Sequence, residues 1–121
     1  MPLRILVVDD NIVARSLLRE FFDILGHEVV AEAATLPETE SAYRTHAPDL
    51  VTLDLSLPTT DGLDVLKALL AIDGKARVLV ISANSQQLVR DAVLAAGAVG
   101  FVTKPVSIAE MKAALAGLPP A

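Results

Sequence analysis

Acidic, hydroxyl and basic side chains follow directly on short apolar runs at four places in this sequence. Asp9 and Asp10 follow residues 5–8, Asp54 follows residues 50–53, Ser82 follows residues 78–81 and Lys104 follows residues 99–103. Three carboxylates brought close together repel one another unless they take up protons or bind a cation. Because no histidine or cysteine lies near these residues in the sequence, the oxygen ligands favour a hard ion such as Mg²⁺.

The residue types at the ends of these runs are suited to phosphoryl transfer. A carboxylate held beside Mg²⁺ can act as a nucleophile toward a phosphoryl group and form an acyl phosphate. Lys104 offers an ammonium group, Ser82 a hydroxyl group and Ala83 a backbone N–H for the charge on the phosphoryl oxygens. The structural alternative is that the three aspartates cap helices or interact with helix N-termini.

Five apolar runs alternate with five segments of helical pattern, and this alternation predicts how the polar residues are positioned. We expect strands at residues 5–8, 27–33, 50–53, 78–81 and 99–103, and helices at residues 11–25, 35–47, 62–72, 85–96 and 107–118. The pattern predicts an α/β fold with an open five-stranded parallel sheet and helices on both faces. An eight-stranded α/β barrel needs about 250 residues, so this chain of 121 residues is too short to form one. Ligands of open parallel sheets bind at the carboxyl ends of the strands, where the polar residues are expected.

The composition limits the class of protein. The chain has 121 residues, of which 53% are hydrophobic, so we expect one domain, residues 1–121, with a full core. Its formal net charge of -5 argues against direct binding to nucleic acid. The absence of cysteine excludes disulfides and thiol catalysis. No apolar stretch is long enough to cross a membrane and no signal pattern is evident, so we expect a cytoplasmic location.

Five short motifs carry a resemblance to a known family. They are Asp9-Asp10-Asn11, the segment from Asp54 to Pro58, Asp61-Gly62, Ser82-Ala83 and Thr103-Lys104-Pro105. Their order and spacing resemble the receiver domain of response regulators in bacterial two-component systems, over residues 4–118. The resemblance implies a (βα)5, flavodoxin-like, doubly wound fold and a single receiver (phosphoacceptor) domain.

The resemblance also implies a role for each site residue. Asp54 would be the phosphoacceptor, and the metal ligands would be Asp9, Asp10, Asp54 and the backbone carbonyl of Ser56. The Ser82 hydroxyl, the Ala83 N–H and the Lys104 ammonium would bind the phosphoryl group. The Lys104–Pro105 peptide bond would be cis.

Ser82 and Phe101 would form the conformational switch of this family. Phosphorylation adds nearly two negative charges, which would draw Ser82 toward the phosphoryl group and let Phe101 rotate inward. The surface formed by residues 85–96, 99–103 and 107–118 would then change and bind a downstream target protein. A histidine kinase or phosphotransfer protein would supply the phosphoryl group. The domain would be a monomer or weak dimer that catalyses its own phosphotransfer and dephosphorylation and is not otherwise an enzyme.

Three functions compete at this point. A stand-alone module resembling chemotaxis-type single-domain receivers is favoured over the receiver part of a larger regulator, such as a transcription factor or a methylesterase. An aspartyl-phosphate phosphatase of the haloacid-dehalogenase type is less favoured, because Asp9-Asp10-Asn11 lacks the second aspartate two residues after the first.

Several polar residues are expected to be structural. They are Asp61 as a helix cap, His27 and His46 as surface histidines, and Arg90 and Asp91 on a solvated helix face.

Overall fold

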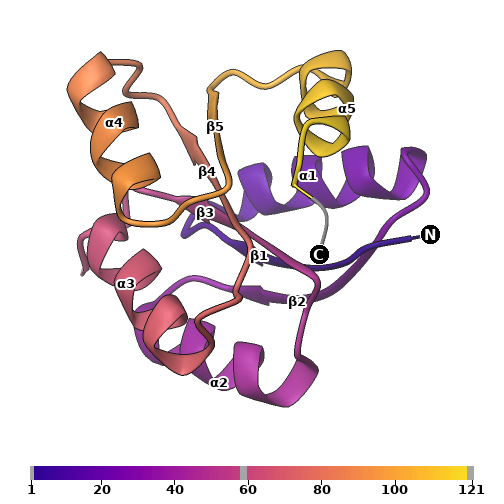
Figure 1. Cartoon of the computed structure of the whole chain (residues 1–121). Coiled ribbons are helices and arrows are strands. Elements are labelled where there is room, and N and C mark those ends of the chain that lie inside the picture. Colours follow the sequence, from indigo (N-terminus) through magenta and orange to yellow (C-terminus); the bar gives the residue numbers. More distant parts are fainter. Residues whose placement is uncertain (1, 58–59, 120–121) are drawn as a thin grey trace.

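Five strands alternate with five helices in the part of the chain that the structure describes (Figure 1), as the sequence predicted. The computed structural model describes residues 2–57 and 60–119, so Pro58 of the motif that begins at Asp54 lies outside the described residues. The strands are β1 (Arg4–Val8), β2 (Glu28–Ala33), β3 (Leu50–Asp54), β4 (Val78–Ser82) and β5 (Gly100–Thr103). The helices are α1 (Ile12–Ile24), α2 (Leu36–His46), α3 (Gly62–Ile72), α4 (Gln87–Ala95) and α5 (Ile108–Ala116).

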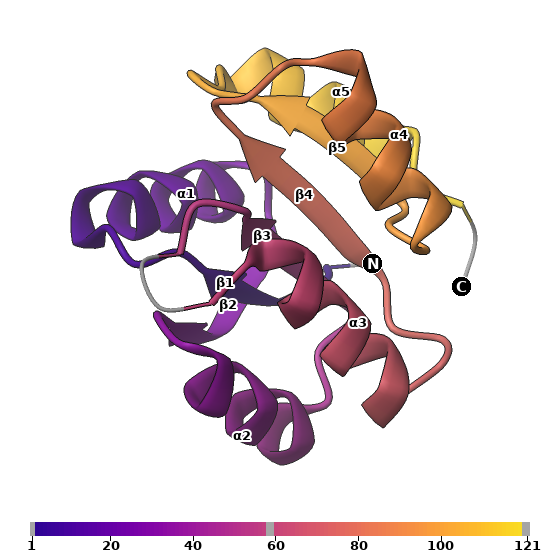
Figure 2. The same ribbon diagram turned by 90° about the vertical axis from the view of Figure 1, so that its left-hand side faces the viewer.

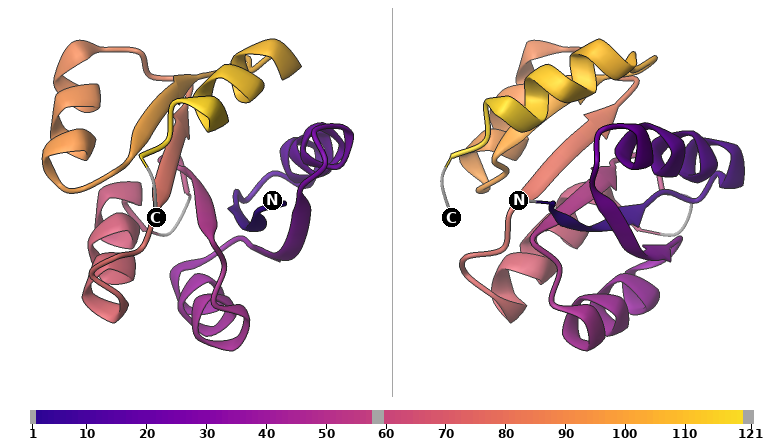
Figure 3. Two further views of the ribbon diagram at one scale, coloured as in Figure 1. Left: turned by 45° about the vertical axis from the view of Figure 1, so that its right-hand side comes forward. Right: turned by 90° about the vertical axis from the view of Figure 1, so that its right-hand side faces the viewer.

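The strands form one parallel sheet in the order β2-β1-β3-β4-β5. Helices α2, α3 and α4 lie on one side of the sheet (Figures 1 and 2). Helices α1 and α5 cover the other side, as the right-hand view of Figure 3 shows. The predicted open, doubly wound α/β architecture is therefore confirmed.

Alternate residues of the central strands supply two separate cores. On β1, Ile5 and Val7 pack in the core under α1 and α5, whereas Leu6 and Val8 pack in the core under α2, α3 and α4. All four side chains are at most 1% exposed. A strand that is buried on both faces has to be apolar throughout, which is why the apolar runs of the sequence located the sheet.

Four of the five described helices, all except α4, begin with a side chain that accepts a hydrogen bond from a first-turn N–H. Asn11 accepts hydrogen bonds from the backbone N–H groups of Val13 and Ala14 at the start of α1. Asp61 accepts one from the Leu63 N–H at the start of α3, so the predicted capping role of Asp61 is confirmed. Gly62 follows this cap, and an added Cβ there would lie 2.4 Å from the Leu55 Cα atom.

Several predicted boundaries differ from the structure by one or two residues. The fourth helix begins at Gln87 instead of residue 85, because the Asn84 side chain accepts a hydrogen bond from the Gln86 N–H and holds the preceding residues in a turn. The fifth strand begins at Gly100, and the last helix ends at Ala116. None of the helices in the described part of the chain has the length and apolar character needed to cross a membrane.

Candidate functional site

The carboxyl edge of the sheet brings together the polar residues that were expected at the strand ends. Asp9 directly follows β1, Asp54 ends β3, Ser82 ends β4 and Lys104 directly follows β5. Because the strands are parallel and adjacent, these four positions share one edge.

Three carboxylates form a cluster at this edge. Each of Asp9, Asp10 and Asp54 offers an oxygen, and these oxygens all lie within 4.8 Å of one another. Asp9 and Asp54 are buried, at 1% and 6% exposure, whereas Asp10 is exposed and gives access from solvent. In the described part of the chain, no other group of three such ligands comes together.

Lys104 is the cation that faces this cluster. Its Nζ atom lies 3.0 Å from Asp9 Oδ2 and 3.2 Å from Asp54 Oδ2. Partial burial disfavours the ammonium, but the hydrogen bond to Asp9 and the charges of Asp54 and Asp9 outweigh it, so the pKa of Lys104 is raised. One ammonium facing three carboxylates leaves about two negative charges unbalanced when all are ionised, and this oxygen-only donor set fits a divalent hard cation.

Backbone N–H groups orient the two buried carboxylates. Asp9 Oδ1 accepts a hydrogen bond of 2.9 Å from the Asn11 N–H, and Asp54 Oδ1 accepts one of 2.9 Å from the Ser56 N–H. In each carboxylate the other oxygen binds Lys104. Ser56 therefore lies at the site, whereas the metal-binding role of its carbonyl remains a prediction.

Ser82 connects the site to the neighbouring strand. Its side chain is 1% exposed, and its Oγ atom accepts a hydrogen bond of 3.1 Å from the Asn84 N–H. The Lys104 N–H donates to the Ser82 carbonyl at 2.9 Å. Ala83 follows β4 and is exposed at the same edge. The Lys104–Pro105 peptide bond is cis, as the resemblance implied.

Phe101 is half-buried on β5 and packs against the core under α2, α3 and α4. It pairs in register with Val80 of β4, so it lies on the same face of the sheet as Ser82, which is two residues further along. The Arg90 guanidinium of α4 lies 5.1 Å from the centre of the Phe101 ring. Arg90 was expected only on a solvated face, and its contact with Phe101 corrects that expectation.

Arg15 also contacts the site and is held by Glu32, and sequence reasoning missed both residues. The Arg15 Nη1 atom donates a hydrogen bond of 2.6 Å to the Asp9 carbonyl, and its Nε atom donates one of 3.0 Å to Glu32. A side chain that binds a backbone carbonyl leaves no recognisable pattern in residue types. The available signal was the expected position of Arg15, one turn into the helix that follows Asp9 and Asp10.

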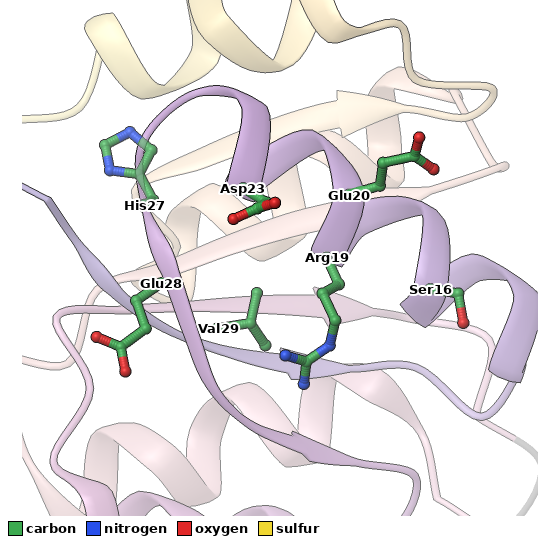
Figure 4. A pocket seen from close by; sticks show the side chains of 7 residues that line it. All are labelled: Ser16, Arg19, Glu20, Asp23, His27, Glu28 and Val29. Atoms are coloured by element: carbon green, nitrogen blue, oxygen red, sulfur yellow. The ribbon is translucent and has the colours of Figure 1, made fainter.

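A polar hollow of about 630 Å³ lies between α1 and β2 (Figure 4). The carboxylates of Glu20, Asp23 and Glu28 point in different directions in this hollow and do not converge on a metal position. His27 is half-buried there, and its Nδ1 atom accepts a hydrogen bond of 3.0 Å from the Leu3 N–H. None of Asp9, Asp10 and Asp54 lines this hollow, so it is separate from the acidic cluster.

Comparison with known proteins identifies the class that this fold and site define. The family model for the response regulator receiver domain matches residues 5–116. The chain belongs to this family.

Among individual proteins, the chain is similar to the chemotaxis protein CheY of two bacteria. It is 40% identical to that of Bacillus subtilis over 105 residues, and 36% identical to that of Thermotoga maritima over 105 residues. Each alignment covers 87% of this chain and 88% of the relative. These matches run almost the whole length of each relative, so they do not favour the receiver part of a larger regulator over the chemotaxis-like receiver.

The fold is also similar to a solved structure, the CheX–CheY–BeF3–Mg complex of Borrelia burgdorferi. The TM-score is 0.91 at 31% identity, and the match covers 95% of this chain and 87% of that chain.

Proposed function

We propose that this receiver domain accepts a phosphoryl group on Asp54 in a reaction that requires Mg²⁺ bound by Asp9, Asp10, Asp54 and the Ser56 carbonyl. The observation that carries this proposal is the cluster of three carboxylates around one ammonium at the end of β3. The cation would neutralise charge on the carboxylates and on the transferred phosphoryl group. Residues 1–121 would act as one phosphoacceptor domain, in the cytoplasm.

Asp54 is the proposed nucleophile because the surrounding groups keep it buried and oriented. The Ser56 N–H holds one oxygen, and Lys104 holds the other. A carboxylate oxygen attacks phosphorus, an O–P bond forms, and the P–N bond of a phosphohistidine breaks with its electron pair returning to the histidine. Lys104, the Ser82 hydroxyl and the Ala83 N–H then stabilise the phosphoryl oxygens.

The proposed output is a change of the face formed by α4, β5 and α5. Ser82 and Phe101 share one face of neighbouring strands, so displacement of Ser82 toward the phosphoryl group opens space that Phe101 can enter. A histidine kinase or phosphotransfer protein would donate the phosphoryl group, and a target protein would bind the changed face. The domain would act as a chemotaxis-like module, as a monomer or weak dimer, and would turn over no separate substrate.

Intact mass spectrometry tests this proposal directly. The protein is incubated with acetyl phosphate with and without Mg²⁺, beside the Asp54→Asn variant. We expect one phosphoryl adduct that needs both Mg²⁺ and Asp54. An adduct that persists in Asp54→Asn, or that forms equally without Mg²⁺, would contradict the proposed site. Sustained hydrolysis of a general phosphatase substrate would instead support an enzyme.

A further inference from the structure

The Arg15 side chain links helix α1 to the end of β1 and to β2. From the first turn of α1 it donates to the Asp9 carbonyl at 2.6 Å and to the Glu32 carboxylate on β2 at 3.0 Å. Its side chain is only 17% exposed. The Asp9 N–H in turn donates to the Ala33 carbonyl at 3.0 Å. Both peptide groups of Asp9 are therefore held, one by β2 and the other by Arg15.

The peptide group that Arg15 holds is the one that joins Asp9 to Asp10. Its orientation sets the direction in which the Asp10 side chain leaves the backbone. Within the residues that the structure describes, the Asp10 carboxylate itself forms no hydrogen bond or ion pair. The backbone alone thus directs this exposed carboxylate toward the Asp9 and Asp54 oxygens.

A guanidinium beside a cation site would repel the cation, and the Glu32 carboxylate offsets this by pairing with Arg15. This carboxylate binds Arg15 and also Arg19, whose Nε atom lies 3.1 Å away. These hydrogen bonds, with Arg19 first, outweigh burial and lower the pKa of Glu32, so the carboxylate stays ionised and balances the charge of Arg15. Figure 4 shows Arg19 reaching from α1 toward β2. The hydrogen bonds of Arg19 in the described residues go to Glu32 and not to Asp9.

We propose that Arg15 is a positioning residue for the acidic cluster, which fixes the Asp9–Asp10 peptide group so that Asp10 can bind the divalent cation. The inference rests on the proposed function for the identity of the cation. Residues that orient metal ligands without touching the metal typically change affinity 10–100-fold when they are replaced. The hydrogen bonds of Arg15 go to the Asp9 carbonyl and to Glu32, so its effect would be on cation binding.

The Mg²⁺ affinity of Arg15 variants distinguishes a positioning role of Arg15 from an effect of its positive charge. Loss of the positive charge in Arg15→Ala would by itself strengthen Mg²⁺ binding, whereas loss of positioning weakens it. We expect Arg15→Ala to weaken binding about tenfold, as measured by NMR titration with Mg²⁺ alone. Arg19→Ala removes the same charge and another bond to Glu32 but leaves the Asp9 contact, so its affinity should match the wild type or be slightly higher.

A second readout follows phosphorylation by acetyl phosphate as the Mg²⁺ concentration is varied. For Arg15→Ala the half-saturating Mg²⁺ concentration should rise about tenfold, while the maximal rate changes much less. Arg15→Lys keeps one hydrogen-bond donor, so its Mg²⁺ affinity and half-saturating Mg²⁺ concentration should lie between those of Arg15→Ala and the wild type. This variant replaces Arg15→Ala in both measurements if the alanine variant does not fold.

Unchanged or tighter Mg²⁺ binding in Arg15→Ala and Arg15→Lys would overturn the inference, as would an equal loss in Arg19→Ala. The NMR titration keeps this result distinct from failure of the proposed function. If the wild type binds Mg²⁺ but forms no phosphoryl adduct, the proposed function fails, and the role of Arg15 is still decided by the titration.

Discussion

The ammonium of Lys104 lies between two buried carboxylates, so the acidic cluster depends on this side chain for positive charge unless a cation is bound. Asp9 and Asp54 are both less than a tenth exposed and both bind Nζ of Lys104. Removal of one partner from a buried ion pair leaves an uncompensated charge, which costs more than the pair contributes. Lys104 is therefore expected to stabilise the domain when no cation is bound, in addition to binding the phosphoryl group.

We predict that Lys104→Met lowers the free energy of unfolding without Mg²⁺ by about 1–2 kcal/mol, since partial exposure of the lysine reduces the full effect. Addition of Mg²⁺ should recover more stability in this variant than in the wild type, because the cation replaces the missing positive charge. Urea unfolding with and without Mg²⁺ measures both effects. The control is Lys112→Met, which removes an exposed lysine of α5. Equal Mg²⁺ responses in Lys104→Met and the wild type would contradict this account.

At the scale of elements, a hydrogen bond of 2.9 Å joins the Tyr43 hydroxyl of α2 to Asp73, the residue that directly follows α3. Burial and this bond raise the pKa of Tyr43 from 10.0 to about 12. The unfolded chain loses this proton more readily, so the contribution to stability is complete below pH 10.0 and is lost as the pH rises toward 12. The Lys75 N–H and the Tyr43 hydroxyl lower the pKa of Asp73. The ionised Asp73 therefore contributes stability that is lost only as the pH falls below 3.8.

We predict that Tyr43→Phe destabilises the domain by about 1 kcal/mol at neutral pH. The difference from the wild type should shrink as the pH rises above 10.0 toward 12, where the wild-type tyrosine ionises. Urea unfolding from neutral to about pH 11 measures this convergence. A difference that stays constant across that range would show that the hydroxyl contributes through packing and not through the bond to Asp73.

Most of the elements and much of the site were predictable because each depends on a local pattern. Strands buried on both faces must be apolar, and the ends of parallel strands share an edge, so the convergence of Asp9, Asp54 and Lys104 followed from their positions. The contact of Arg15 with the Asp9 carbonyl was not predictable, since any donor of suitable length could bind a backbone oxygen. The start of α4 was misplaced because the Asn84 side chain competes for the backbone N–H of Gln86.

At the scale of the whole molecule, the proposed signal has to pass from the end of β3 to α4 across β4 and β5. Arg90 lies over Phe101 and connects α4 to β5. An exposed cation–π contact contributes about 0.5–1 kcal/mol, enough to bias two conformations of Phe101 several-fold. The Arg90 contact would thus favour the unphosphorylated arrangement.

We predict that phosphorylation changes amide hydrogen exchange in α4 and β5 and leaves α2 nearly unchanged. Arg90→Ala should shift the exchange of the unphosphorylated protein part of the way toward the phosphorylated pattern, because Phe101 loses one of its contacts. Asp91→Ala, on the same helix, is the matched control. Equal changes in α2, or no difference between Arg90→Ala and Asp91→Ala, would contradict a switch through this face.

The central claim is that the phosphoryl group is carried by the Asp54 carboxylate, and borohydride reduction tests it most directly. An acyl phosphate of aspartate is reduced to homoserine, whereas phosphate bound in any other way leaves aspartate intact. After treatment with acetyl phosphate and Mg²⁺, peptide mapping should find homoserine at position 54 and aspartate at positions 9 and 10. Homoserine at position 9 or 10, or an adduct that yields none, would contradict the account.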